Sequence, residues 1–142
     1  MLKHHRVAAL SVALAGTLAV GACGSEDDKD KTATEAAEQK SSPQVAISEI
    51  GETQAGLKKG LAAYDPAKPA RADEIVAETY LQHFEKVEGP LGKVDPHLNE
   101  ELEEAISGEI RTDIKKKVAR ADLERLIRST QADLETAKDK LR

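Results

Sequence analysis

The acidic and imidazole side chains between residues 80 and 88 offer the clearest chemistry in this 142-residue chain. The segment reads Tyr-Leu-Gln-His-Phe-Glu-Lys-Val-Glu, in which Glu85 and Glu88 are three residues apart. Residues at this spacing are neighbours on a helix, so the two carboxylates could bind one hard cation. His83 could add an imidazole ligand. The sequence therefore predicts a metal site at Glu85, Glu88 and His83. The alternative is that His83 lines the edge of the core while both glutamates face water.

A second group of polar side chains, Asp95, His97 and Glu101, lies at the start of an expected helix. His97 and Glu101 are one helical turn apart and could share a ligand. Acidic residues near a helix start are also favoured by the helix dipole alone, so we expect a structural role.

Motifs of known catalytic chemistry are absent from the sequence. It has no Gly-rich phosphate loop and no Gly-x-Ser-x-Gly. We therefore expect no enzymatic activity. A small enzyme using Glu and His would need His83 or His97 within hydrogen-bonding reach of a carboxylate in a cleft.

Cys23, the single cysteine of the chain, follows a segment typical of secretory signals. Lys3 and Arg6 precede an apolar stretch from Val7 to Val20, and small residues lead up to Cys23. This arrangement resembles the lipobox of bacterial lipoproteins. The resemblance implies that residues 1–22 are a signal peptide and that Cys23 is lipidated, with the protein anchored on the extracytoplasmic face of the cell membrane. Two acyl chains suffice for stable anchoring.

The charge of the expected mature chain argues against nucleic acid as a partner. Loss of residues 1–22 reduces Lys and Arg from 21 to 19 against 26 Asp and Glu, which gives a net charge of −7. Only 2% of residues are aromatic, so platforms for base stacking are also missing.

The segment that follows Cys23 is polar. Residues 24–43 contain no Val, Ile, Leu or Phe and cannot bury enough apolar surface to offset the entropy lost on ordering. We expect residues 23–43 to form the lipidated cysteine and a flexible tether. A short solvated helix through residues 35–38 is the alternative.

Residues 44–142 show apolar side chains at steps of three and four, the period of amphipathic helices. Four such stripes are separated by Asp65-Pro66, by Gly89-Pro90 and, with neither Gly nor Pro, by Lys115–Lys117. The stripes are Ile47, Ile50, Gln54, Leu57, Leu61 and Tyr64; Ile75, Val76, Thr79, Tyr80, His83, Phe84 and Val87; Leu98, Leu102, Ala105, Ile106, Ile110 and Ile114; and Leu123, Ile127, Thr130, Leu134, Ala137 and Leu141. The pattern predicts an all-α domain, an antiparallel bundle of about four helices. One long bent helix from Pro96 to Leu141 is the alternative for the last two.

The stretch from Tyr80 to Arg142 resembles the extracytoplasmic helical region of some bacterial high-affinity iron permeases. The shared positions are Tyr80, Phe84-Glu85-x-x-Glu88, Leu91, Asp95-Pro96, Leu102-Glu103, Leu123, Leu126 and Leu134. The resemblance implies a role in iron handling, with Glu85 and Glu88 as candidate ligands and Tyr80 and Phe84 as packing residues. The chain lacks the Arg-Glu-x-x-Glu of the permeases, so we do not expect it to be the transporter. Lys116-Lys117 also stands where a Gly-containing turn would be more typical.

These observations together predict a non-enzymatic lipoprotein that assists iron or metal uptake by binding a cation or by docking to an iron permease. The alternative is an interaction or scaffold lipoprotein of the envelope that binds no metal. Such a protein would leave apolar side chains outside the core, and Leu81, Leu126 and Ile75 are the candidates.

Overall fold

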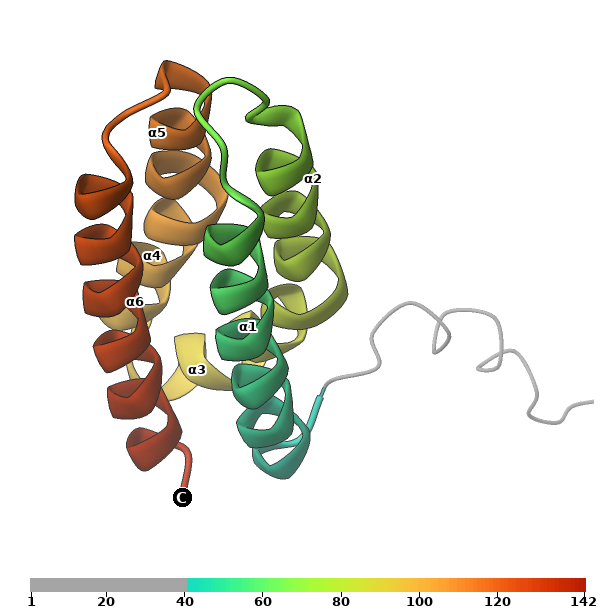
Figure 1. Ribbon diagram of the computed structural model, residues 1–142. Helices are drawn as coiled ribbons and strands as arrows, with labels where there is room; N and C mark the ends of the chain where they lie inside the picture. Colours follow the sequence, from blue (N-terminus) through green and yellow to red (C-terminus); the bar gives the residue numbers. More distant parts are fainter. Residues whose placement is uncertain (1–40) are drawn as a thin grey trace, which may run out of the picture. The chain divides into compact units, whose positions relative to one another are not determined.

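Residues 41–142 form an antiparallel bundle of helical rods in the computed structural model, which describes this part of the chain (Figure 1). The described residues contain no strand. The elements are α1 (Pro43–Ala63), α2 (Ala70–Thr79), η1 (Tyr80–Phe84), α3 (Glu85–Val94), α4 (Pro96–Glu103), η2 (Glu104–Glu109), α5 (Ile110–Lys116) and α6 (Arg120–Lys140), where η1 and η2 are π-helical segments. The predicted all-α bundle is confirmed.

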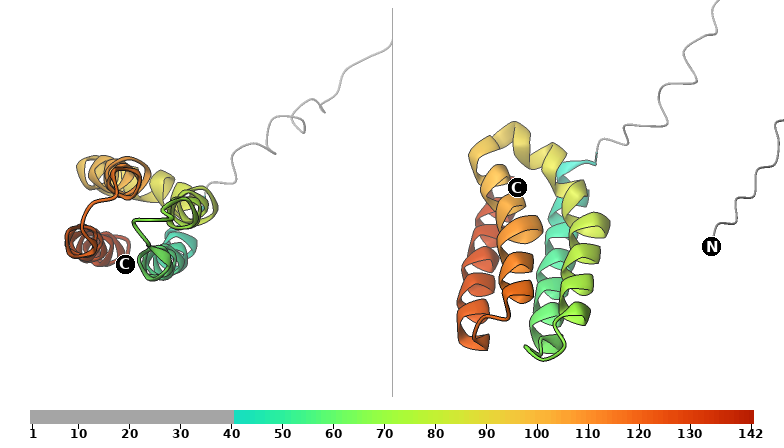
Figure 2. Two further views of the ribbon diagram at one scale, coloured as in Figure 1. Left: turned by 45° about the horizontal axis from the view of Figure 1, so that its top comes forward. Right: turned by 90° about the horizontal axis from the view of Figure 1, so that it is seen from above.

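Four rods make up this bundle (Figure 2). The first is α1, the second is α2 with η1, the third is α4 with η2 and α5, and the fourth is α6. The short helix α3 connects the second rod to the third at one end of the bundle (Figure 1). The third rod, with Glu103 and the glutamates of η2, is thereby placed beside α6 on one side and α2 on the other.

The start of α1 and the break after it follow local sequence signals. Ser42 accepts a hydrogen bond from the backbone N–H of Val45 at 3.3 Å, and Pro43 occupies the first turn. After α1, Asp65 Oδ1 accepts the N–H of Ala67 at 2.8 Å and forms the predicted turn. The helical domain thus begins at Pro43, next to the expected start at residue 44. The predicted signal peptide, Cys23 and the tether up to residue 40 lie outside the described residues.

The predicted apolar stripes form the core. Phe84 is fully buried, and the third and fourth stripes are buried along their lengths except for Ala105, which is half-buried. The remaining fully buried large side chains are Ile50, Leu57, Leu91, Leu102, Ile106, Ile110, Ile114, Leu123, Leu134, Val76 and Val87. Helical periodicity therefore identified most of the core, but Ile47, Gln54 and Leu61 of the first stripe are half-buried, and the fully buried Leu91 lies outside the predicted stripes.

The prediction that Gly89-Pro90 ends the second helix is wrong, because α3 continues to Val94. Pro90 has no N–H, so the carbonyl of Lys86 loses its helical partner. The hydroxyl of Ser41 donates a hydrogen bond to that carbonyl. A residue before α1 thereby satisfies the group that the proline leaves free, and the Pro90 ring is itself buried.

The chain reverses direction after Lys116, so the alternative of one bent helix from Pro96 to Leu141 is wrong. Lys117 adopts a left-handed conformation with φ 58° and ψ 42°. Its N–H donates to the Ile114 carbonyl at 3.1 Å, and that of Val118 donates to the Asp113 carbonyl at 3.2 Å. These two bonds form a Schellman cap, which ends the helix without the usual glycine.

Close packing of α1 on α2 depends on glycine. A Cβ atom at Gly56 would lie 2.9 Å from the Cβ of Thr79, and one at Gly60 would lie 2.8 Å from Cγ2 of Val76. Both separations are shorter than side-chain contacts permit, so the absence of a side chain sets the distance between the helices.

We expect Gly56→Ala to lower the free energy of unfolding by about 1–3 kcal/mol, because the added methyl group overpacks the α1–α2 interface. Gly51 is the matched control, since a Cβ there meets nothing within 4 Å. Gly51→Ala should instead stabilise the protein by up to about 1 kcal/mol through helix propensity. Urea unfolding of both variants checks this, and a stabilised Gly56→Ala would contradict it.

Candidate functional site

Tyr80 and Glu88 form a hydrogen-bonded pair where the second rod passes into α3. The Tyr80 hydroxyl donates to Glu88 Oε1 at 2.8 Å. The Tyr80 ring also packs on Phe84, with ring centroids 5.9 Å apart. The predicted packing role of Tyr80 is confirmed. The sequence had not predicted its hydrogen bond to Glu88. The signal available in the sequence was the separation of residues 80 and 88, about two helical turns.

Glu88 contacts Tyr80 directly, and the charges of Glu103 and Glu85 also act on it; we call Tyr80 and these three carboxylates the Tyr80 cluster. Burial is the main cause that raises the pKa of Glu88, and the charges of Glu103 and Glu85 raise it further. The hydrogen bond from Tyr80 acts in the opposite direction. Burial likewise raises the pKa of Tyr80, as do its bond to Glu88 and the charges of all three glutamates. Negative potential therefore accumulates at this point.

Among the described residues, basic side chains do not pair with the carboxylates of the Tyr80 cluster. Within residues 41–142, none of its three glutamates forms an ion pair. Glu103 comes from α4, whereas Glu85 and Glu88 belong to α3. Sequence reasoning had not proposed Glu103 as a candidate ligand, because no local spacing connects it with the other two.

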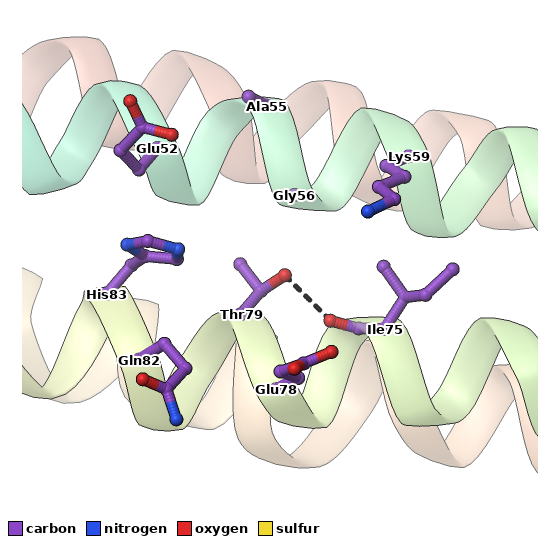
Figure 3. Close-up of a pocket in the computed structure, with 9 residues that line it drawn as sticks. All are labelled: Glu52, Ala55, Gly56, Lys59, Ile75, Glu78, Thr79, Gln82 and His83. Carbon is purple, nitrogen blue, oxygen red and sulfur yellow. Dashed lines mark hydrogen bonds between the residues drawn. The ribbon is translucent and has the colours of Figure 1, made fainter.

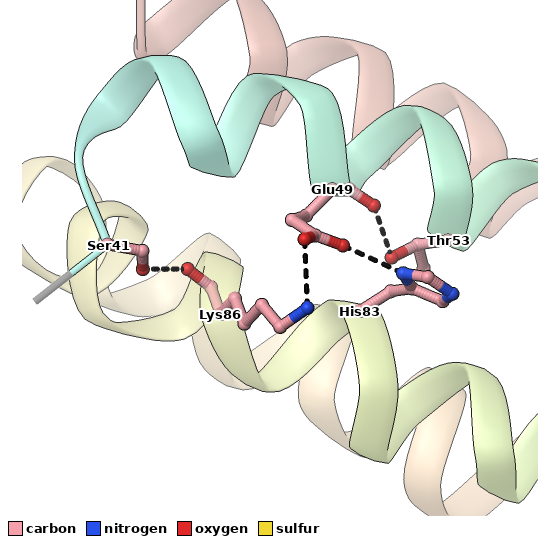
Figure 4. Close-up of polar contacts among 5 residues, drawn as sticks. All are labelled: Ser41, Glu49, Thr53, His83 and Lys86. Atoms are coloured by element: carbon pink, nitrogen blue, oxygen red, sulfur yellow. Dashed lines mark hydrogen bonds and ion pairs between the residues drawn. The ribbon is translucent and has the colours of Figure 1, made fainter. Parts of the chain in front are cut away.

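His83 is engaged by α1. Its Nδ1 lies 2.7 Å from Glu49 Oε2, and Lys86 Nζ donates to Glu49 Oε1 at 2.9 Å (Figure 4). The hydrogen bond from Lys86 is the main cause that lowers the pKa of Glu49, and the His83 contact adds to it against the effect of burial. The structure thus joins Glu85 and Glu88 to Glu103, while His83 links η1 to α1.

The described residues show no group of three or more His, Cys, Asp or Glu side chains arranged to hold a metal ion. The Tyr80 cluster consequently supplies charge and oxygen donors without a closed set of ligands. Ligation by Glu85, Glu88 and His83 stays a prediction from the sequence.

His83 also borders an open groove of about 320 Å³ between α1 and α2 (Figure 3). This meets the geometric condition set for a small enzyme, a histidine near a carboxylate beside a cleft. The groove's hydroxyl is not free to act as a nucleophile, because Thr79 Oγ1 donates to the Ile75 carbonyl at 2.7 Å. The lowered pKa of Glu49 makes it a weak base. The contact between His83 and Glu49 therefore suits a structural link between η1 and α1 better than proton transfer.

The cluster at Asp95 has the expected structural role. Asp95 Oδ1 accepts the N–H of Leu98 at 3.0 Å and Asp95 Oδ2 pairs with Lys140 Nζ at 3.0 Å. The Leu98 bond is the main cause that lowers the pKa of Asp95, and Lys140 adds to it. His97 lies on the surface with its side chain 81% exposed, 3.3 Å from Glu101.

Comparison with protein-family models, curated proteins and solved structures finds no match to this chain. Among the helices of residues 41–142, none combines the length and the apolar character that crossing a membrane requires. The geometry of the site and the sequence patterns are therefore the basis for a functional proposal.

We expect Glu88→Gln to stabilise the protein near neutral pH. Folding raises the pKa of this carboxyl, so the folded protein favours its protonated form. The stability that this contributes is fully present below the pKa of the unfolded chain and is lost as the pH rises through the pKa of the folded protein. The amide still accepts the Tyr80 hydrogen bond but carries no charge. The gain should be no more than about 1 kcal/mol, since Glu88 is partly exposed.

This gain should shrink as the pH falls through the raised pKa of Glu88, and it should be absent below 4.5, the ordinary pKa of this carboxyl. Urea unfolding near neutral pH and near pH 4 measures it. Exposed Glu78→Gln is the control and should show no such pH dependence. An equal stability difference at both pH values for Glu88→Gln would contradict the prediction.

Proposed function

We propose that this protein is a non-enzymatic lipoprotein of the cell membrane that captures a cation, iron in the first place, for a membrane partner such as an iron permease. The observation that carries the proposal is the Tyr80 cluster, in which the charges of Glu103 and Glu85 act on Glu88 and none of the three pairs with a basic side chain of residues 41–142. Burial is the main cause of the raised pKa of Glu88, and a bound cation would relieve the part that the charges of Glu103 and Glu85 add.

The donor types suit a hard cation. Carboxylate oxygens bind such ions well, and Glu85 and Glu88 are adjacent on α3. Without a closed set of ligands, the ion would keep part of its hydration shell. Weak and exchangeable binding of this kind suits cargo that is passed on to a partner. The resemblance of residues 80–142 to the extracytoplasmic region of iron permeases supports iron as that cargo.

The proposed anchor is Cys23. The residues between Cys23 and α1 would act as a polar tether of roughly twenty residues, which spans at most about 65 Å when fully extended. Such a reach lets the helical domain meet a membrane partner while the lipid holds it at the extracytoplasmic surface.

A calorimetric titration of the full chain in detergent tests cation capture. We expect saturable binding of Fe²⁺ or of Fe³⁺ supplied as nitrilotriacetate, and a loss of affinity of at least about tenfold in the Glu85→Gln/Glu88→Gln variant, because the ligand charges are removed. Glu74→Gln/Glu78→Gln removes the same charge from exposed positions of α2 and should bind as the wild type does. Absence of binding to the wild type, or equal loss in both variants, would contradict the proposal.

Labelling of growing cells with an alkyne analogue of palmitate tests the anchor. The wild-type chain should incorporate the label and Cys23→Ser should not, because the thiol is the acceptor. Ser25→Ala is the control at a neighbouring position and should be labelled normally. An unlabelled wild-type chain would refute lipidation.

The scaffold alternative has one observation in its favour. Leu81 is 55% exposed, whereas Ile75 is buried and Leu126 is half-buried against the core. A scaffold needs no cation, so the titration above distinguishes the two functions.

A further inference from the structure

A groove runs between the third rod and α6, away from the Tyr80 cluster. It consists of two hollows of about 520 and 320 Å³ that share Glu104, Glu109 and Leu126 in their linings. Figures 1 and 2 show α5 beside α6, and η2 directly precedes α5 in the same rod. From Glu101 to Lys116 the rod that forms one wall is about 22 Å long.

The floor of this groove includes the apolar side chain of Leu126, and one position of its wall, Gly108, has no side chain. Leu126 is half-buried and packs on the core, so part of its surface faces the groove. Gly108 leaves the opposite wall open, since a Cβ there would contact only Cγ of Glu104, at 4.0 Å. Both features leave space along the groove for an added apolar side chain.

The rim carries four carboxylates that form no ion pair within residues 41–142, and one basic side chain, Lys116. The carboxylates are those of Glu104, Glu109, Asp113 and Asp133. The acidic residues of α6 show the contrast clearly. Those that do not line the groove are paired with nearby basic side chains: Asp122, Glu124 and Glu135 with residues of α6, and Asp139 with Arg142 just after it. Asp133 lines the groove and has no such partner.

We infer that this groove docks a basic amphipathic helix of a partner protein. Leucine or isoleucine side chains of that helix would rest on Leu126, and its Lys and Arg side chains would pair with the carboxylates of the rim. Helices bind in this way to grooves between two helices, and opposite charges fix the register and speed association.

A single small cation fits the groove less well than a helix does. The carboxylates are distributed along two rods and around the apolar side chain of Leu126, whereas an ion requires donors that converge on one point. The inference goes beyond cation capture and does not depend on it, because the groove and the Tyr80 cluster have no residue in common.

The test uses the full chain in nanodiscs and a fluorescent model peptide of about 20 residues, with Leu at helical spacing and Lys elsewhere. Anisotropy is read after subtraction of binding to empty nanodiscs. We expect saturable binding that Gly108→Leu weakens by at least about tenfold, because the new side chain fills the groove. Gly51→Leu adds the same side chain on the open surface of α1 and should leave affinity unchanged.

A second pair of variants separates local charge from net charge. Glu104→Gln/Glu109→Gln should weaken peptide binding by about tenfold, while Glu74→Gln/Glu78→Gln should change it by less than about twofold. Circular dichroism checks that each variant is folded. Leucine has a higher helix propensity than glycine, so we expect neither Gly108→Leu nor Gly51→Leu to disrupt the helix that contains it.

Equal binding by the two leucine variants, equal loss in the two charge variants, or equal binding of a peptide with Glu in place of Lys would each overturn the inference. A wild-type dimer that Gly108→Leu dissociates would also overturn it, because a second copy of the chain would then occupy the groove.

Discussion

Burial of the apolar stripe of α1 is the interaction on which the rest of the bundle depends. This helix packs against α2, α3 and α6, and its Ile50 and Leu57 are fully buried. Complete burial of such a side chain contributes about 1.5–3 kcal/mol. Gly56 and Gly60 let α2 approach α1 closely, and Glu49 of α1 pairs with His83 of η1 and Lys86 of α3. Packing and polar contacts therefore act together along α1.

The two π-helical segments lie next to the two surfaces for which we propose functions. Tyr80 is the first residue of η1, and Glu104 and Glu109 are the first and last residues of η2. An inserted residue in a helix shifts the faces that follow it, and such segments are frequent at functional sites. In this bundle, η1 lies between Thr79, which faces α1, and the glutamates of α3.

The third rod contributes to both surfaces. Glu103 contributes charge to the Tyr80 cluster, while the next residue, Glu104, lines the groove beside α6. Consecutive residues of a helix point in directions about 100° apart, so one rod can present charge to two faces. Cation capture on one face and partner docking on another would suit a protein that works between a solute and a membrane partner. The raised pKa of Glu88 indicates that the first face is maintained at some cost in stability.

The sequence alone determined the class of the fold, most of the core positions and the caps with local signals. Apolar spacing identified the buried stripes, and Asp95-Pro96 marked the start of α4, because periodicity and capping depend on residues within a turn or two. Tertiary structure decided the rest. Helix α3 continues through Pro90 because distant Ser41 supplies a donor, His83 pairs with Glu49 of another helix, and Glu103 joins Glu85 and Glu88 only when α4 packs nearby. Contacts between residues far apart in the chain depend on how the rods pack, and no local pattern of residue types encodes that.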